Sequence, residues 1–169
     1  MSDPKSCPAC GYIAGKARST ADHRRFFAVI RAAFQNWPEK HEFQPDDAEH
    51  LRAWLLCRAG YRDVTTIPVP SDMPPSVVRL ITLATEASIK AAKSKGAAVH
   101  AFVRPGEHAV AVFSAKSIDF NTLDQREFGR VRDAVEAVIA AELHVTAADL
   151  LRATRDHEGE DHGHEATAA

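Results

Sequence analysis

The sequence is short of the features that mark several classes of protein. Aromatic residues make up only 7% of its 169 residues, and it contains three cysteines. An odd and small number of cysteines argues against a paired disulfide framework, so we expect a reducing, cytoplasmic environment. No apolar run approaches the roughly 20 residues of a transmembrane helix, and the first residues are too polar for a secretory signal. We therefore expect neither a membrane protein nor a secreted one.

Sequence motifs for catalysis are absent as well. The chain has no Gly-x-Ser-x-Gly elbow, glycine-rich phosphate loop, His-Glu-x-x-His motif or EF-hand loop. Acid pairs such as Asp46 and Asp47 suit helix capping better than a nuclease centre. We predict a protein without catalytic activity, with a structure-specific, metal-dependent nuclease as the minor alternative.

The formal net charge of −2 conceals two charged segments of opposite sign. Between Lys5 and Arg31 there are six basic residues and one acid, whereas residues 156–169 hold five acids and neither lysine nor arginine. A basic segment and an acidic tail often accompany binding to nucleic acid or to an acidic partner. Ordinary solvated surface is the alternative interpretation.

Apolar periodicity predicts a helix-rich α+β fold, a single domain with a small antiparallel sheet. Helices are predicted at residues 20–35, 47–59, 76–95, 124–142 and 147–153. Strands are predicted at residues 64–69, 99–104 and 108–113, the last two as a hairpin. The expected organisation is a flexible, cysteine-containing arm at 1–17, a globular domain at 18–155 and a disordered, acidic, histidine-rich tail at 156–169.

Helix ends and buried faces follow from the same pattern. We expect Ser19 or Thr20 to cap the first helix, Asp46 to cap the second and Thr146 to cap the last. The inward face of the first helix is predicted to carry His23, Phe27, Ile30, Phe34 and Trp37. The inward face of the helix at 76–95 is predicted to carry Val77, Leu80, Ile81, Ala84, Ile89 and Ala92.

Cys7 and Cys10 form the sharpest local motif, Cys-Pro-Ala-Cys-Gly. Two thiolates at this spacing can chelate zinc, but a closed structural site needs four ligands and no second Cys-x-x-Cys exists in the chain. One hypothesis is a zinc ion shared between two chains. The alternative is a pair of mobile thiols without metal.

The basic segment is the better candidate for function. Its arm and first helix carry Lys16, Arg18, Arg24, Arg25 and Arg31. Such cations supply sequence-independent affinity for phosphates that falls steeply with salt. Tyr12, Phe26 and Phe27 are interleaved with these cations, and bases can stack on such rings. Phe27 also fits the core face, and Phe26, the next residue round the helix, is predicted to lie at the edge of the groove.

Three stretches resemble small phage and prophage proteins grouped with, or near, the NinB/Orf recombination proteins of lambdoid phages. The stretches are residues 18–27 continuing to 34–39, residues 43–45 with 49–55, and residues 116–120 with 123–128. The resemblance covers most of the chain, although the cysteine-bearing arm and the histidine-rich tail depart from the family pattern.

The resemblance implies a non-enzymatic recombination mediator. Such proteins bind single-stranded DNA or single-strand/duplex junctions, usually as homodimers, and contact the host single-strand-binding protein. The alternative is a phage-encoded protein-interaction module that inhibits a host defence or nuclease complex.

Overall fold

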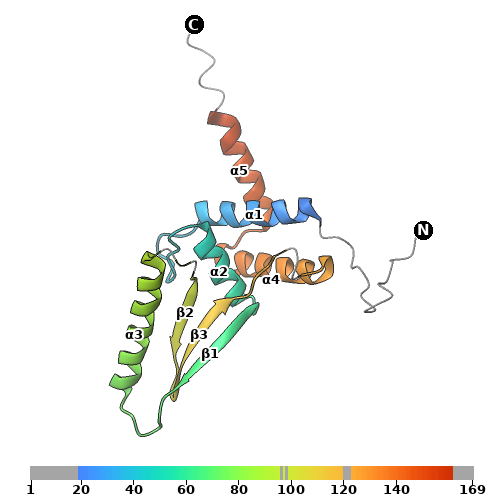
Figure 1. The fold of residues 1–169 in the computed structure, drawn as a ribbon. Coiled ribbons are helices and arrows are strands. Elements are labelled where there is room, and N and C mark those ends of the chain that lie inside the picture. The colour runs from blue at the N-terminus through green and yellow to red at the C-terminus, as the bar shows by residue number, and fades with distance from the viewer. Residues whose placement is uncertain (1–18, 96, 98, 120–122, 162–169) are drawn as a thin grey trace, which may run out of the picture. The chain divides into compact units, whose positions relative to one another are not determined.

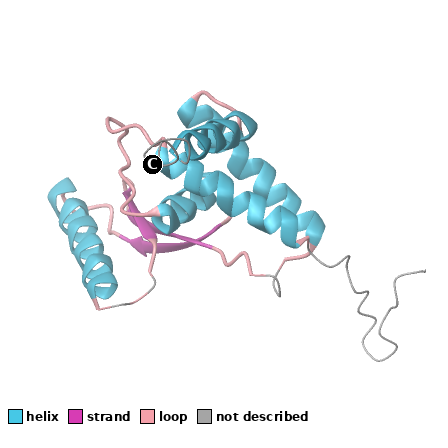
Figure 2. Ribbon diagram, turned by 90° about the horizontal axis from the view of Figure 1, so that it is seen from above, coloured by secondary structure: helices cyan, strands magenta, loops and turns pink. Residues whose placement is uncertain are grey.

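The computed structural model describes residues 19–95, 97, 99–119 and 123–161 (Figure 1). Five helices and a three-stranded antiparallel sheet lie in these residues, and helix predominates (Figure 2). The predicted helix-rich α+β class with a small antiparallel sheet is confirmed. No helix within these residues combines the length and the apolar character needed to cross a bilayer.

The chain divides into two compact units, which we name by their content. The helical unit comprises Met1–Gln44 and Ser117–Ala169, and the sheet unit comprises Pro45–Lys116. The helical unit is therefore discontinuous in sequence, and the sheet unit is inserted between its two parts. Each unit is described by itself.

The helical unit contains α1 (Thr20–Gln35), α4 (Gln125–Leu143) and α5 (Ala147–Asp161), and α1 packs against both of the others. Its core is built around Phe26 and Phe128, whose rings meet edge to face with centroids 5.6 Å apart. Burying an aromatic side chain of this size is among the largest single contributions that a core receives. These two rings therefore fix α1 against α4.

The predicted caps of this unit are largely correct. The Ser19 hydroxyl accepts the N–H of Asp22 at 3.3 Å at the start of α1, and Thr146 accepts the N–H of Asp149 at 3.2 Å at the start of α5. The predicted end of α5 is wrong, because the helix continues to Asp161 instead of stopping at residue 153. The first six residues of the expected disordered tail are thus helical.

The sheet unit contains α2 (Ala48–Arg58), β1 (Arg62–Pro68), α3 (Pro75–Ser94), β2 (Ala101–Pro105) and β3 (Ala109–Ala115). The strand order is β1-β3-β2, so the predicted hairpin of β2 and β3 is present and β1 pairs with the free edge of β3. α3 packs along the sheet, where Val78, Val110 and Val69 form a small core.

Two predictions for the sheet unit need correction. The cap of α2 is Asp47, whose carboxylate accepts the N–H of His50 at 2.7 Å, and not Asp46. A cap residue accepts from the N–H two or three residues later, and His50 stands at that distance from Asp47.

The end of α2 follows expectation, because Gly60 adopts a left-handed conformation with φ of 84°.

The inward face of α3 is also different from the prediction. Its buried residues are Val78 and Thr82, whereas Leu80 and Ala84, which we expected inside, are exposed. Thr82 is tolerated inside because its hydroxyl donates to the carbonyl oxygen of Val78 at 2.9 Å. The apolar pattern of α3 is wider than the strip that the sheet covers.

Candidate nucleic-acid interface

A chain of polar contacts fixes the start of α1 beside α4. The N–H of Ser19 donates to the side-chain oxygen of Gln125 at 2.7 Å, and the amide of Gln125 donates to Asp22 at 2.6 Å. Arg132 of α4 lies 3.5 Å from the same Asp22 carboxylate. These contacts determine which side of α1 faces α4, and with it which arginines remain outside.

Arg25 belongs to this polar edge. Its guanidinium donates to Glu136 at 2.7 Å, and Arg132 lies 4.0 Å from the same carboxylate. Most of the charge that Arg25 brings to the surface is therefore balanced within the helical unit. To hold a phosphate, as the sequence predicts, Arg25 would first have to leave Glu136.

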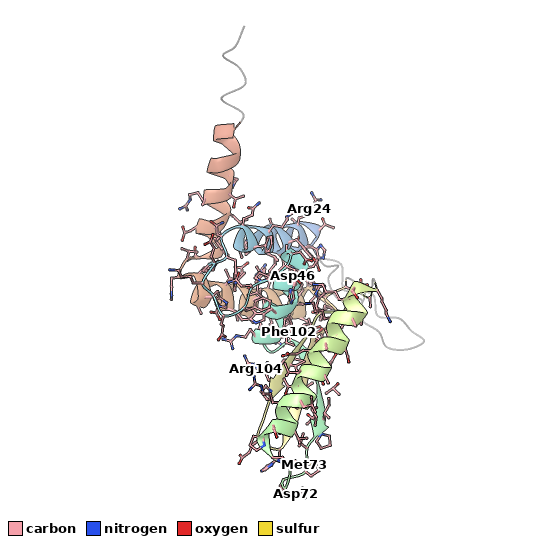
Figure 3. All side chains as sticks on the ribbon, turned by 90° about the vertical axis from the view of Figure 1, so that its left-hand side faces the viewer. Arg24, Asp46, Asp72, Met73, Phe102 and Arg104 are labelled. Atoms are coloured by element: carbon pink, nitrogen blue, oxygen red, sulfur yellow. The ribbon has the colours of Figure 1, made fainter. Side chains whose placement is uncertain are left out.

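Arg24 and Arg31 lie on a different side of α1. Both are exposed, and within the described residues neither forms an ion pair. Figure 3 shows Arg24 pointing outward from α1. The two residues are two helical turns apart, so they lie about 10.5 Å from each other along the axis. They form an outward pair of cations that no acidic side chain of the described residues compensates.

The prediction for Phe26 is wrong. Its side chain is only 1% exposed, and it packs against Phe128, so it cannot stack on a base. The buried face of α1 holds Phe26, Val29, Ile30, Ala32 and Ala33. This face is turned by about one residue, or about 100°, from the predicted one, because small alanines are buried where α1 packs against neighbouring helices.

The same rotation leaves Phe27 half-buried instead of central to the core. Phe27 stands three residues after Arg24 and four before Arg31, so it borders their side of the helix. Its ring is held by His23, with centroids 4.7 Å apart, and by the edge of Phe26 at 5.5 Å. Phe27, one of the two aromatic residues of α1 that the sequence offers for stacking, is thus the aromatic neighbour of the outward arginines.

The remaining residues of the predicted site, Lys16, Arg18, Cys7 and Cys10, lie outside the described residues. The third cysteine, Cys57, is buried in α2, and burial raises the pKa of its thiol to about 11. A thiol with this pKa stays protonated near neutral pH and is a poor metal ligand. In the described part of the chain, no three histidine, cysteine or acidic side chains are grouped to hold a metal ion.

A histidine cluster in the sheet unit was missed from the sequence. His50 of α2 stacks on Phe102 of β2 with centroids 5.6 Å apart, and the His100 ring lies 5.7 Å from that of His50. Burial and the nearby Lys93 lower the pKa of His50. His100 and Phe102 are two residues apart, which places them on one side of an extended chain. This spacing is the sequence signal from which the cluster could have been predicted.

This cluster offers packing more than chemistry. Asp46 lies 3.3 Å from His50 but also accepts from Lys93 at 2.6 Å. The His50 imidazole is stacked on Phe102, half-buried and preferentially neutral. We therefore assign the cluster a structural role at the α2–β2 contact.

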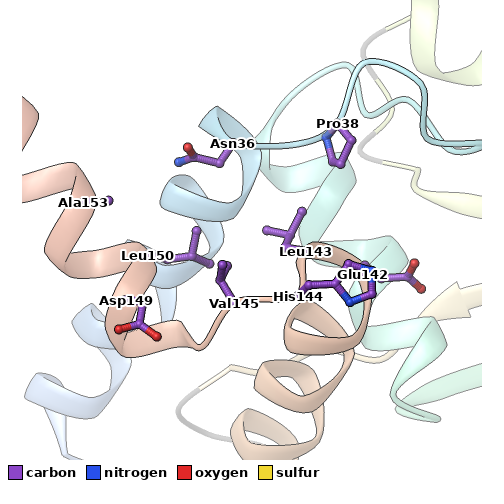
Figure 4. Close-up of a pocket in the computed structure, with 9 residues that line it drawn as sticks. All are labelled: Asn36, Pro38, Glu142, Leu143, His144, Val145, Asp149, Leu150 and Ala153. Atoms are coloured by element: carbon purple, nitrogen blue, oxygen red, sulfur yellow. The ribbon is translucent and has the colours of Figure 1, made fainter.

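A pocket of about 400 Å³ lies in the helical unit, between the end of α4 and the start of α5 (Figure 4). Leu143, Val145 and Leu150 make its wall largely apolar. Its two carboxylates are already engaged, since Glu142 contacts His41 at 3.1 Å and Asp149 accepts from Thr146 at 2.6 Å. These two carboxylates are thus committed to internal contacts.

Comparison with known proteins leaves the geometry as the main guide to function. No protein-family model, curated protein or solved structure matches the chain.

Proposed function

We propose that the helical unit binds single-stranded nucleic acid, without catalysis, through the outward arginines of α1. The observation that carries the proposal is the contrast between neighbours: Arg25 is paired with Glu136, whereas Arg24 and Arg31 are exposed without an ion pair among the described residues. Guanidinium groups are well suited to phosphate, which they contact in a planar, bidentate manner.

Phe27 supplies the second part of the interface. Single strands are held by cationic grooves combined with aromatic rings on which bases stack, at about 1–3 kcal/mol per base. Phe27 is half-buried and braced by two other rings, so its position beside Arg24 and Arg31 is maintained without a ligand. A braced ring loses little conformational entropy when a base stacks on it.

This activity agrees with what the resemblance to NinB/Orf recombination proteins implies. A mediator that acts in the cytoplasm on single strands or single-strand/duplex junctions needs affinity without sequence preference, and phosphate contacts provide it. Contact with the host single-strand-binding protein, and zinc held by Cys7 and Cys10, are further parts of the same hypothesis.

The experiment compares two double variants of equal charge change. Arg24→Ala/Arg31→Ala removes the outward pair, and Arg104→Ala/Lys95→Ala removes two exposed cations from the sheet unit. Fluorescence anisotropy with a labelled single strand, a duplex and a junction gives affinity as a function of salt. For the single strand, log affinity falls with log salt, and we expect the first variant to make this slope about 1.4 less steep. Between about 50 and 200 mM salt, the variant should therefore lose about sevenfold less affinity than the wild type loses.

The control variant should keep the wild-type slope. An unchanged slope in Arg24→Ala/Arg31→Ala, or an equal change in both variants, would contradict the proposal. Cleavage of any of the three substrates in the presence of magnesium would instead support the nuclease alternative.

A further inference from the structure

The outer face of α3 exposes large apolar side chains. Leu80 is 65% exposed and Leu83 is 53% exposed, although α3 buries Val78 and Thr82 on its opposite side. Leu83 points almost directly away from the sheet, since five residues from Val78 correspond to a turn of about 140°. Leu80 and Leu83 are neighbours on the helix surface, so together they form an apolar patch of the kind that partners cover.

Charged residues border this face on one side only. Arg79 and Glu86 are exposed, and neither forms an ion pair within the described residues. On the helix surface both lie about 40–60° to the same side of Leu83, while Leu80 and Ala87 lie to the other side. The exposed Lys90, two turns after Leu83, lies about 20° to the same side as Arg79 and Glu86. The face thus consists of a central leucine, a charged edge with these three residues and an apolar edge.

We propose that this face binds a second copy of the chain, with the two α3 helices antiparallel and Leu83 on the two-fold axis. A two-fold axis of this kind reverses the direction of the helix but keeps each edge on its own side. Arg79 lies four residues before Leu83 and Glu86 three residues after it. Arg79 of one copy therefore comes within about 1.5 Å, along the axis, of Glu86 of the other.

The apolar edge is self-complementary in the same arrangement. Leu80 lies three residues before Leu83 and Ala87 four residues after it, so the symmetry places the large side chain of one copy opposite the small one of the other. Alternation of large and small side chains is what lets two helices interdigitate. The same axis therefore matches two ion pairs and two apolar contacts around the central leucines.

A parallel arrangement does not give this match. A two-fold axis along the helices would place the charged edge of each copy against the apolar edge of the other, so neither Arg79 nor Glu86 would meet an opposite charge. The charge pattern selects the antiparallel dimer. Because one helix face buries less surface than a standard protein interface, we expect dissociation in the micromolar range.

The test measures molecular mass by analytical ultracentrifugation from about 1 to 500 µM, a range that brackets such a dissociation constant. The wild-type chain should pass from monomer to dimer. Leu83→Glu, which places two like charges on the axis, should remain monomeric. Because Leu83 is exposed, we expect the circular dichroism spectrum and melting curve of the Leu83→Glu variant to match those of the wild type at low concentration.

Two charge reversals make the test specific for the antiparallel pairing. Arg79→Glu and Glu86→Arg should each weaken self-association at least tenfold, because each creates two like-charge contacts in its own dimer. Mixed in equal amounts, they should associate again, since both contacts between positions 79 and 86 in the mixed dimer join opposite charges. Leu83→Glu added to either chain should abolish this recovery.

A wild-type chain that stays monomeric throughout the range would overturn the proposal and leave the face to a partner of different sequence. A dimer that tolerates Leu83→Glu, or charge variants that fail to recover on mixing, would overturn it too. None of these outcomes bears on nucleic-acid binding by α1, because neither reversed residue belongs to that surface.

Discussion

Helices α1 and α3 are both amphipathic in sequence, yet they use their apolar residues differently. α1 buries five residues, including Phe26 and Ile30, and exposes arginines. α3 buries only Val78 and Thr82 and exposes Leu80 and Leu83. α1 packs against α4 and α5, whereas α3 packs against β2 and β3 of a narrow sheet. Amphipathicity thus shows that a helix has an apolar side, but not that its own chain covers all of it.

The largest expected effect comes from the buried face of α1. Phe26→Ala should lower the free energy of unfolding by about 3–5 kcal/mol, because it leaves a cavity beside Phe128. Urea denaturation followed by circular dichroism measures this change. Phe27→Ala, at the half-buried neighbour, serves as the matched control and should lower the free energy of unfolding by clearly less. Equal losses at the two positions would show that the assigned core face of α1 is wrong.

A smaller effect is expected on the buried side of α3. Val78→Ala removes two methyl groups from the core against the sheet and should lower the free energy of unfolding by about 1.5 kcal/mol. Leu80→Ala, on the outer side of the same helix, should change it by less than about 0.5 kcal/mol in dilute solution. Denaturation at low and high protein concentration separates intrinsic stability from dimerisation, since only the latter depends on concentration. A larger loss at Leu80 than at Val78 in dilute solution would reverse the assignment of the two sides.

The smallest effect concerns the polar edge of α1. Arg25→Ala should cost about 0.2–1 kcal/mol of stability, the usual range for a partly exposed ion pair. Arg24→Ala should leave the free energy of unfolding nearly unchanged, because Arg24 forms no ion pair within the described residues. A double-mutant cycle with Glu136→Gln isolates the pair, and its coupling energy should fall as salt is raised. A coupling energy of zero at low salt would show that the contact does not persist in solution.

The sequence was sufficient to predict features that depend on local chemistry. Ser19 and Thr146 cap helices because their hydroxyls accept backbone N–H groups a few residues away. Gly60 ends α2 because it tolerates a left-handed conformation. The hairpin of β2 and β3 was also predictable from local sequence, since two short segments with the pattern of β-strands flank the turn residues Pro105 and Gly106.

Features that depend on distant residues could not be predicted in this way. Phe26 and Phe27 are adjacent and chemically identical, and only the packing of α1 against other helices decides which ring is buried. Likewise, the sequence pattern does not specify how wide a strip of α3 the sheet covers. The candidate interface changed accordingly: Phe27 replaced Phe26, and Arg25 was found to be paired with Glu136.

The discontinuous helical unit has a consequence for how the chain is synthesised. Phe26 emerges from the ribosome before the sheet unit, whereas Phe128 emerges after it. At about 5–20 residues per second, the apolar side of α1 waits several seconds for α4. The sheet unit, which is contiguous, can form its own core during that time. The nascent chain therefore carries an incomplete helical core through much of translation, and a holdase chaperone that covers α1 during that interval would raise the yield of folded protein.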